Sequence, residues 1–469
     1  MRLRTTTALA ALLAAGVTPL TLTSPASAAA AKYADDFNGD GYRDLAIGDE
    51  GATVGGKKQA GAVIVIWGSS KGLDPARRTV VSQNSAGIPG AAETSDFFGR
   101  DITTVDLNKD GYADVIATAP GEEDGAYNGV FTVLWGSKSG LTSGSAYRNP
   151  KHKDRGFAKD IAVGDFDADG RQDVVAVDDQ NIWYLRGPFT KSGSRGKATD
   201  FDPIDGENID PELVVSGKVT KDGTADFAVL GRDWDTDDDR VWFYKGGKGG
   251  PKKTKKVNLP SSASLLEGSA TIADFDKNGY GDLAIGGRRS GKGGGVYVLR
   301  GTSTGPSTSA KTITQSTSGV PGTPESWDDF GSDVSSADTN GDGYPDLAVG
   351  VPGEVLGDNW AAVGGVTVLR GSSSGLTGKN ARNYDYATAG VAGVPNEDND
   401  AWFGDSVLLR DFNRDGRAEL VAAAPESIPG RLHLLPGTSS GPTGKGSQML
   451  TLKTLGLTSL SNLYAELAD

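Results

Sequence analysis

The hydrophobic and polar positions from Phe330 to Leu376 follow an order that predicts short β-strands. A brief alternating segment follows Phe330-Gly331, and an apolar run, Leu347–Gly350, comes after a polar loop. A connection rich in Gly and Pro then leads to the β-branched run Val366–Leu369, a polar turn and a weaker outer segment. Short apolar runs bounded by Gly and Pro are typical of strands and give no helical period. This unit therefore predicts four short strands and no helix.

The same order of segments returns along the chain. Six other apolar runs match the third strand of the unit: Val63–Trp67, Val130–Trp135, Ile182–Leu185, Val241–Tyr244, Val296–Leu299 and Leu432–Leu435. The Phe-Gly pair returns as Phe98-Gly99 and Phe403-Gly404, and in weaker form as Phe157-Ala158 and Leu266-Glu267. Units of this size cannot bury their apolar faces alone, so each must pack against its neighbours.

The repeats predict an all-β fold, a seven-bladed β-propeller built from four-stranded antiparallel blades. The polar loops start at residues 36, 106, 165, 218, 274, 338 and 411, so successive units lie 53 to 73 residues apart. An open β-solenoid is the alternative, but its repeats are much shorter. We expect one domain over residues 29–469, with blades starting near residues 29, 98, 157, 210, 266, 330 and 403.

Each polar loop carries oxygen-bearing side chains at alternating positions. Asp36–Asp44 reads D-F-N-G-D-G-Y-R-D, with side-chain oxygens at loop positions 1, 3, 5 and 9 and glycine at position 6. Such oxygens can surround one hard cation together with the backbone carbonyl of position 7, and the glycine permits the sharp turn. The predicted metal ligands are Asp36, Asn38, Asp40, Tyr42, Asp44, Asp106, Asn108, Asp110, Tyr112, Asp114, Asp165, Asp167, Asp169, Arg171, Asp173, Asp274, Asp276, Asn278, Tyr280, Asp282, Asp338, Asn340, Asp342, Tyr344, Asp346, Asp411, Asn413, Asp415, Arg417 and Glu419.

The ligand set favours Ca²⁺, with about six sites, because it contains oxygen and neither His nor Cys. The loop at 218–226 is degenerate, since Lys218 stands where the first acid is expected. An EF-hand is disfavoured because it requires Glu at position 12, where these loops have Ile47, Ala117, Ala176, Ile285, Gly350 and Ala422. A solvated Asx-turn without an ion is the alternative for each loop.

The N-terminal residues indicate export. Met1–Ala28 combines two arginines, an apolar run and the small residues Ala26-Ser27-Ala28, as in a secretory signal peptide. No later stretch is apolar enough to cross a membrane, so we expect a secreted, extracellular protein. The chain has no cysteine, and bound cations would replace disulfides as a means of stabilisation. Without the two arginines the chain has 45 basic and 61 acidic residues, a charge of −16 that disfavours nucleic acid as a partner.

A serine-hydrolase motif also occurs, but in a context that argues against catalysis. G-x-S-x-G appears at Gly68–Gly72, Gly301–Gly305, Gly371–Gly375 and Gly437–Gly441, each time after a third strand and before a polar turn. In α/β-hydrolases this motif leads into a helix, and one enzyme does not need four equivalent nucleophiles. Only His152 and His433 are available as bases. We interpret the motif as a structural turn and predict no catalytic residues.

The order Phe-Gly, cation loop and Gly-Ala-Pro-like segment, as in Ala117–Gly121 and Val349–Gly353, resembles the FG-GAP repeat of integrin α-subunit propellers and their bacterial relatives. The resemblance covers about residues 31–469. It implies Ca²⁺ in the hairpin between the first two strands of six blades. The loop at Lys218 departs from the family pattern, and Glu419 in place of the final Asp is a milder departure.

The resemblance implies a binding or adhesion module whose extracellular protein or glycan ligand binds the face opposite the cations. Trp327, Trp360, Trp402 and Tyr127 are expected in the loops of that face, either exposed to a ligand or packed against the loop bases. The alternatives are a secreted hydrolase or polysaccharide lyase on a calcium-stabilised propeller, and a purely structural envelope protein. We expect a monomer with no transmembrane segment.

Ring closure departs from the integrin plan, in which the N-terminal segment supplies an outer strand of the final blade. The last unit has its own outer strand, Gln448–Leu455, and the Phe-Gly position of the first unit falls at Ala28. Within the tail, Leu463-Tyr464-Ala465 resembles Phe97-Phe98-Gly99. We therefore predict that the tail docks on the first blade and that Tyr464 fills the gap between the first and seventh blades; a frayed terminus is the alternative.

Overall fold

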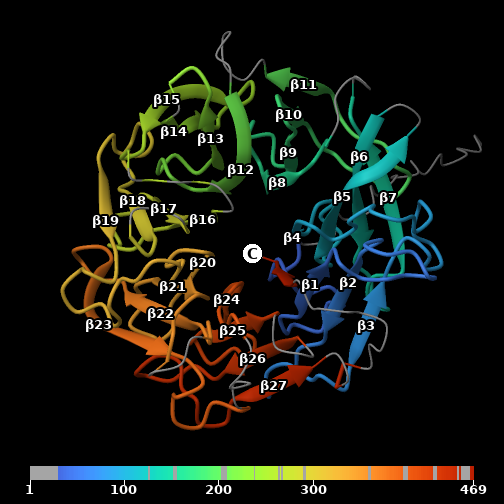
Figure 1. Ribbon diagram of the computed structural model, residues 1–469. Coiled ribbons are helices and arrows are strands. Elements are labelled where there is room, and N and C mark those ends of the chain that lie inside the picture. Colours follow the sequence, from blue (N-terminus) through green and yellow to red (C-terminus); the bar gives the residue numbers. More distant parts are fainter. Residues whose placement is uncertain are drawn as a thin grey trace, which may run out of the picture.

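Seven four-stranded antiparallel sheets stand in a ring around a central axis (Figure 1), and the predicted seven-bladed propeller is confirmed. The computed structural model describes residues 30–124, 127–150, 156–201, 209–236, 238–261, 263, 265, 268–288, 292–356, 361–393, 400–425, 430–451, 454–455 and 465–468. The predicted signal, Met1–Ala28, lies outside these residues. The described part of the chain contains no helix, and hence none that could span a membrane.

Each blade is a simple antiparallel meander from the axis outward. The strands of the first two blades are β28 (Ala465–Leu467), β1 (Leu45–Asp49), β2 (Ala62–Ile66), β3 (Arg78–Val81), and β4 (Ile102–Val105), β5 (Asp114–Asp124), β6 (Tyr127–Trp135), β7 (Ser143–Arg148). The third and fourth blades contain β8 (Asp160–Gly164), β9 (Asp173–Val177), β10 (Ile182–Leu185), β11 (Ala198–Phe201), and β12 (Ile209–Gly217), β13 (Asp226–Asp233), β14 (Asp238–Lys245), β15 (Lys252–Asn258).

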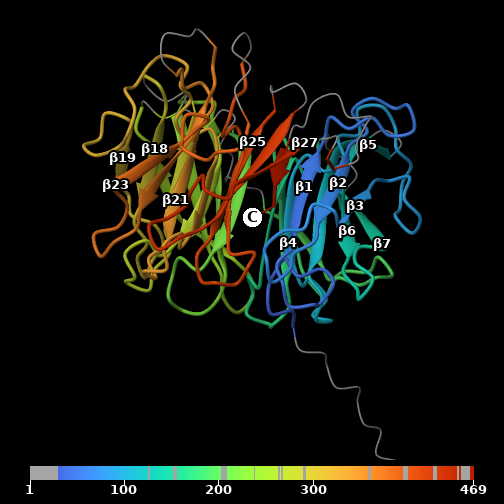
Figure 2. The same ribbon diagram turned by 90° about the horizontal axis from the view of Figure 1, so that it is seen from below.

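The remaining three blades repeat the plan. They contain β16 (Ala270–Ala273), β17 (Asp282–Gly287), β18 (Gly295–Leu299), β19 (Ala310–Ile313); β20 (Val334–Ala337), β21 (Asp346–Val351), β22 (Gly365–Arg370), β23 (Thr377–Tyr384); and β24 (Val407–Arg410), β25 (Glu419–Ala424), β26 (Arg431–Leu435), β27 (Gln448–Thr451). Because neighbouring strands are antiparallel, the connections between first and second strands lie at the opposite end of the blade from those between second and third strands (Figure 2).

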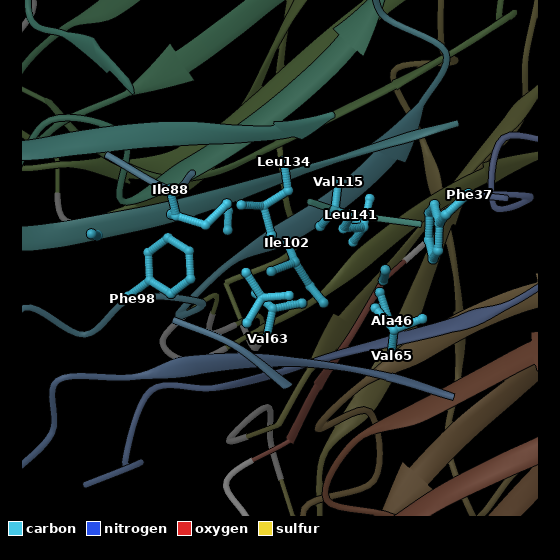
Figure 3. Close-up of a cluster of buried hydrophobic side chains, with 14 of the residues drawn as sticks. Phe37, Ala46, Val63, Val65, Ile88, Phe98, Ile102, Val115, Leu134 and Leu141 are labelled. Carbon is cyan, nitrogen blue, oxygen red and sulfur yellow. The ribbon is translucent and has the colours of Figure 1, made fainter. Parts of the chain in front are cut away.

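The core lies between the blades, because alternate side chains of each strand point to opposite neighbours. On β1, Ile47 packs in a cluster with side chains of the seventh blade, whereas Ala46 belongs to the cluster shared with the second blade. Figure 3 shows the second of these clusters, in which Val63 lies close to Ile102 and Phe98. Burying each large side chain contributes about 1.5–3 kcal/mol, so every blade depends on both neighbours.

Side chains near the axis also join neighbouring inner strands. Asp101 of the second blade accepts the backbone N–H of Ile161 in the third at 2.9 Å, and Asp160 accepts that of Val214 in the fourth at 2.9 Å. Asp333 of the sixth blade does the same for Val407 in the seventh at 2.7 Å. These acids line a central cavity of about 490 Å³, together with basic side chains from three blades, Arg100, Lys159 and Arg288.

The tail docks on the first blade, as predicted, and supplies its inner strand. Residues Ala465–Leu467 pair antiparallel with β1, and Leu467 lies opposite Ile47. Ile102 lies opposite Ala117 in the same way, three residues after Gly99. Leu467 therefore corresponds to Ile102, and the residue number that corresponds to Gly99 is 464. The predicted alignment matched Ala465 with Gly99, so the register of the tail differs from the prediction by one residue. The predicted role of the Tyr464 side chain lies outside the described residues.

Candidate metal centres

Each predicted cation loop lies immediately before the second strand of its blade, so all six lie at the same end of the ring. The local fold follows from side-chain oxygens that accept backbone N–H groups within the loop. In the first loop, Asp36 accepts from Asp40 at 3.1 Å and from Gly41 at 2.8 Å. Asn38 also accepts from Asp40, at 2.8 Å, and Asp40 accepts from Tyr42 at 3.0 Å. Positions 1, 3 and 5 are thereby drawn round one short turn.

The other five loops share most of these hydrogen bonds, although in the sixth blade Asp338 accepts from Asn340 and Gly341 instead of from position 5. The first acid accepts the N–H of the glycine at position 6 in every case, from Gly111, Gly170, Gly279, Gly343 and Gly416. Position 4 has a positive φ in all six loops, although it is a glycine only at Gly39 and Gly341; the others are Lys109, Ala168, Lys277 and Arg414. A left-handed non-glycine residue is unfavourable and persists only where its surroundings impose it. The hydrogen bonds of the acids impose it here.

The acid at position 9 is buried beneath the loop and connects it to the blade. Asp44 accepts the N–H of Phe37 at 3.0 Å and that of Gly68, two residues after β2, at 2.8 Å. Burial raises the pKa of Asp44 to about 7 despite these bonds, and Asp40 and Asp36 add to the effect. Burial likewise raises the pKa of Asp114 to about 8 and that of Glu419 to about 7. Burial thus disfavours the charged form of these three acids, and a bound cation would stabilise it.

One loop brings its carboxylates together closely enough to surround an ion. Oxygens of Asp165, Asp167 and Asp173 all lie within 4.8 Å of one another, the one group of three that the described residues contain. Asp167 is almost fully buried. The donors are hard oxygens throughout the six loops, which fits Ca²⁺. The predicted donors therefore fit the ion in their chemistry, and in one loop three of the carboxylates also converge.

The fourth blade differs, as its sequence suggested. Lys218 supplies no acid at position 1, and Thr220 donates to Asp226 through its backbone N–H at 2.7 Å and its hydroxyl at 2.9 Å. Lys221 at position 4 lacks the positive φ of the other loops. Lys245 pairs with Asp222 at 3.1 Å. A lysine thus contacts the acid that would otherwise face a metal.

The four G-x-S-x-G segments form the same turn, with the predicted structural role. Ser69 donates its hydroxyl to the carbonyl of Gly72 at 2.8 Å, and Thr302, Ser372 and Thr438 make the equivalent bond. Ser137 makes it too, in a segment that has Lys138 at the central position. The central serines, Ser70, Ser303, Ser373 and Ser439, are exposed. His433 is buried against Tyr386, 3.1 Å from its hydroxyl, and burial lowers its pKa to about 3; His152 lies outside the described residues.

The end of the ring opposite the loops carries exposed tryptophans. Trp327, in the connection before β20, is 78% exposed. Trp234, in the β13–β14 hairpin, is 54% exposed and was not predicted, because its acidic surroundings resemble an ordinary solvated loop. Trp402 is partly buried, with the guanidinium of Arg288 5.9 Å from its ring centre. Trp360 and the side chain of Tyr127 lie outside the described residues.

Comparisons with known proteins agree with this geometry. The FG-GAP repeat family model matches residues 34–66, 98–134 and 330–369, which lie in the first, second and sixth blades. A phosphatidylinositol-glycan-specific phospholipase D from Mus musculus is 32% identical over 166 residues, which is 34% of this chain and 18% of that protein. Integrin alpha-5 from Xenopus laevis is 25% identical over 300 residues, 60% of this chain and 27% of that protein. The chain thus spans about a fifth to a quarter of the length of these relatives.

Among solved structures, a putative 6-phosphogluconolactonase from Bacteroides uniformis aligns over 91% of this chain and 99% of its own, with 12% identity and a TM-score of 0.49. The Phe-Gly segments, the six loops and the family match in three blades all describe one repeat. The chain is a seven-bladed β-propeller that contains FG-GAP repeats in three of its blades and is similar in sequence to integrin alpha chains.

Proposed function

We propose that this protein is a secreted, calcium-stabilised binding module that recognises an extracellular protein or glycan. The observation that carries the proposal is that the two ends of the ring differ in the side chains they present. One end carries six loops of the same hydrogen-bonded form, whereas the other carries exposed tryptophans. Exposed aromatic side chains are typical anchors for proteins and sugars.

Ca²⁺ would be held by the side-chain oxygens of loop positions 1, 3, 5 and 9 and the backbone carbonyl of position 7. When bound, it supplies positive charge that offsets the carboxylates. The loop residues themselves hold the hairpin in shape. The first acid fixes the turn through its hydrogen bonds, and the ninth acid attaches the loop to the second and third strands. Stabilising these hairpins stabilises the frame that presents the opposite face.

A second candidate is a hydrolase or lyase, and the acid-lined central cavity is the observation in its favour. The cavity acids argue against it. Asp101 and Asp160 each accept an N–H from the next blade, and their carboxyl groups are hydrogen-bonded to one another. Glycosidases keep their two carboxyl groups about 5 Å or more apart. This pair is therefore better suited to joining blades than to acid–base catalysis.

The test is an array of extracellular proteins and glycans probed with the full chain in Ca²⁺ and in chelator. A hit is then examined with Trp327→Ala and with Tyr344→Ala, which removes an aromatic ring at the loop end. We expect Trp327→Ala to weaken binding at least tenfold and Tyr344→Ala to leave it unchanged. Equal binding by both variants would place the ligand elsewhere, and hydrolysis of an array glycan would favour the enzyme.

A further inference from the structure

The residue at the end of the third strand differs between two halves of the ring. It precedes a glycine in every blade and is, in the order of the seven blades, Trp67, Trp135, Arg186, Lys245, Arg300, Arg370 and Pro436. Four consecutive blades, the third to the sixth, therefore carry a base at this position. The other three, the seventh, first and second, are also consecutive around the ring.

Two of these bases form ion pairs with an additional acid of their own loop. Arg186 pairs with Asp167 and Arg300 with Asp276; the arginine side chains are 41% and 65% exposed, but those of the two acids are 0% and 3% exposed. Both acids occupy position 3. The other four cation loops have asparagine there, at Asn38, Asn108, Asn340 and Asn413. The additional carboxylate occurs only where an arginine faces it.

In the sixth blade the arginine contacts a different acid of the loop. Position 2 is Thr339, whereas the other cation loops have Phe or Leu there, so the space beneath the loop is polar. Arg370 pairs with Asp346 at 2.7 Å and donates to the hydroxyl of Thr339 at 2.5 Å. Arg370 is 9% exposed. The ninth acid of this loop therefore already has a cationic partner.

We propose that Arg186, Arg300 and Arg370 are internal counter-cations that weaken Ca²⁺ binding by their own loops. This inference rests on the proposed calcium binding. A guanidinium that contacts a ligand carboxylate repels a divalent ion bound by the same group, and the burial of Asp167, Asp276 and Asp346 limits screening by solvent. The loops thus form two classes: three paired loops, in the third, fifth and sixth blades, and three open loops, in the seventh, first and second.

Two loops of the open class have a basic neighbour, and these serve as internal comparisons. In the seventh blade, Arg417 lies 3.6 Å from Asp415, and their side chains are 37% and 41% exposed. Lys191 contacts Asp110 of the second loop at 2.8 Å, but its side chain is 46% exposed and that of Asp110 is 31% exposed. Because the acid itself is partly exposed in these pairs, unlike Asp167 and Asp276, solvent screens the interaction and it contributes little. Since the open loops lie on the first blade and its two neighbours, the first ions bound would be those beside the junction of β1 and β28.

The inference is tested by titrating the full chain with Ca²⁺ in a calorimeter and with Tb³⁺ by luminescence. Wild type should show a tighter and a weaker class of sites. Arg186→Met should strengthen one weak site about tenfold, the size expected for removing one unit charge next to a partly solvated divalent ion. Arg186→Met combined with Asp169→Ala should lose the strengthened site, which assigns it to the loop at 165–173.

Two controls remove a positive charge elsewhere: Lys191→Met at the exposed pair, and Arg77→Met on the surface of the first blade. Both should leave every affinity within about twofold. Unchanged or weaker binding by Arg186→Met would overturn the inference, because the arginine would then only position Asp167. Absence of Ca²⁺ binding in all variants, wild type included, would overturn the proposed calcium binding and this inference with it.

Discussion

The carboxylate of Asp333 in the sixth blade accepts the backbone N–H of Val407 in the seventh at 2.7 Å. It also accepts the hydroxyl of Ser406 at 3.2 Å, while its second oxygen accepts its own strand's Val334 N–H at 2.7 Å. One side chain thus joins two sheets beside the axis. Ser269 makes a weaker version of this contact, accepting the Val334 N–H at 3.3 Å.

The first prediction concerns this contact. Asp333→Ala leaves the Val407 N–H without its acceptor and should lower the free energy of unfolding by about 1–3 kcal/mol. The measurement is denaturant unfolding. Thr103→Ser, at another position that lines the cavity, is the control and should change it by less than about 0.5 kcal/mol. Equal unfolding of Asp333→Ala and wild type would mean that water or another side chain replaces the bond.

The second prediction concerns pH. Burial raises the pKa of Asp160 to about 6 and that of Asp101 well above its usual value, and Asp160 adds to the shift of Asp101. Because the folded state holds the proton more tightly than the unfolded state, this contribution is fully present below about pH 4. It is lost as the pH rises through about 6. Wild type in chelator should therefore lose stability between pH 5 and pH 8.

Asp101→Asn keeps an oxygen for the Ile161 N–H and removes one of the two carboxylates. Melting temperatures of this variant should fall less between pH 5 and pH 8 than those of wild type. Asp179→Asn, which changes an exposed acid of the third blade, should behave as wild type does. An identical pH profile for Asp101→Asn would show that the pair does not control this part of the titration.

The third prediction concerns calcium. Chelation should lower the melting temperature, because each filled loop binds only the folded state. Extracellular sites of this kind have Kd near ~10⁻⁴–10⁻³ M, so millimolar Ca²⁺ should be needed for the full effect. Asp40→Ala or Asp342→Ala should each lose one site, whereas Asp222→Ala should leave the stoichiometry unchanged. Superimposable melting curves with and without Ca²⁺ would contradict the assignment.

The fourth prediction concerns the tail. Leu467 is 4% exposed and packs with residues of the first and seventh blades, so Leu467→Ala should cost about 2–5 kcal/mol. Glu466→Gln, the neighbouring residue that lines the cavity, should cost much less. Unfolding free energies decide the matter. If Leu467→Ala unfolds as wild type does, the tail strand contributes little to closing the ring.

The fifth prediction distinguishes a turn from a nucleophile. Ser69→Ala removes the bond to the Gly72 carbonyl and should cost about 0.5–1.5 kcal/mol. Ser70→Ala changes an exposed hydroxyl and should be neutral within about 0.5 kcal/mol. Ser70→Ala should also leave unchanged any hydrolytic activity that the protein proves to have. Loss of such an activity in Ser70→Ala, with folding intact, would overturn the structural interpretation.

The ring could be predicted because each blade has local sequence signals, namely the apolar alternation of its strands and the acids of its loop. The docking of the tail was predicted from Leu463-Tyr464-Ala465, but its register was displaced by one residue. Register is set by the partner strand and its hydrogen bonds, which a short tail segment does not specify.

The contacts between loop acids and strand ends were not predicted, although their residues are visible in the sequence. Asp167 precedes β9, whereas Arg186 follows β10. The two residues meet because β9 and β10 are antiparallel, so that the end of β10 lies beside the start of β9. The signal was the joint presence of Asp at position 3 and Arg before the glycine. The exposure of Trp234 depends on hairpin length, which residue type alone does not determine.

The strand order of the first blade also has a consequence for biosynthesis. Six blades take all four strands from one continuous stretch, so each can pair its strands as soon as that stretch has left the ribosome. The first blade emerges first but stays three-stranded until residues 465–467 have been made. Through that interval the inner edge of β1 keeps unpaired backbone groups, which are a template for pairing with other chains. The oldest blade of the nascent protein is therefore the last to be completed.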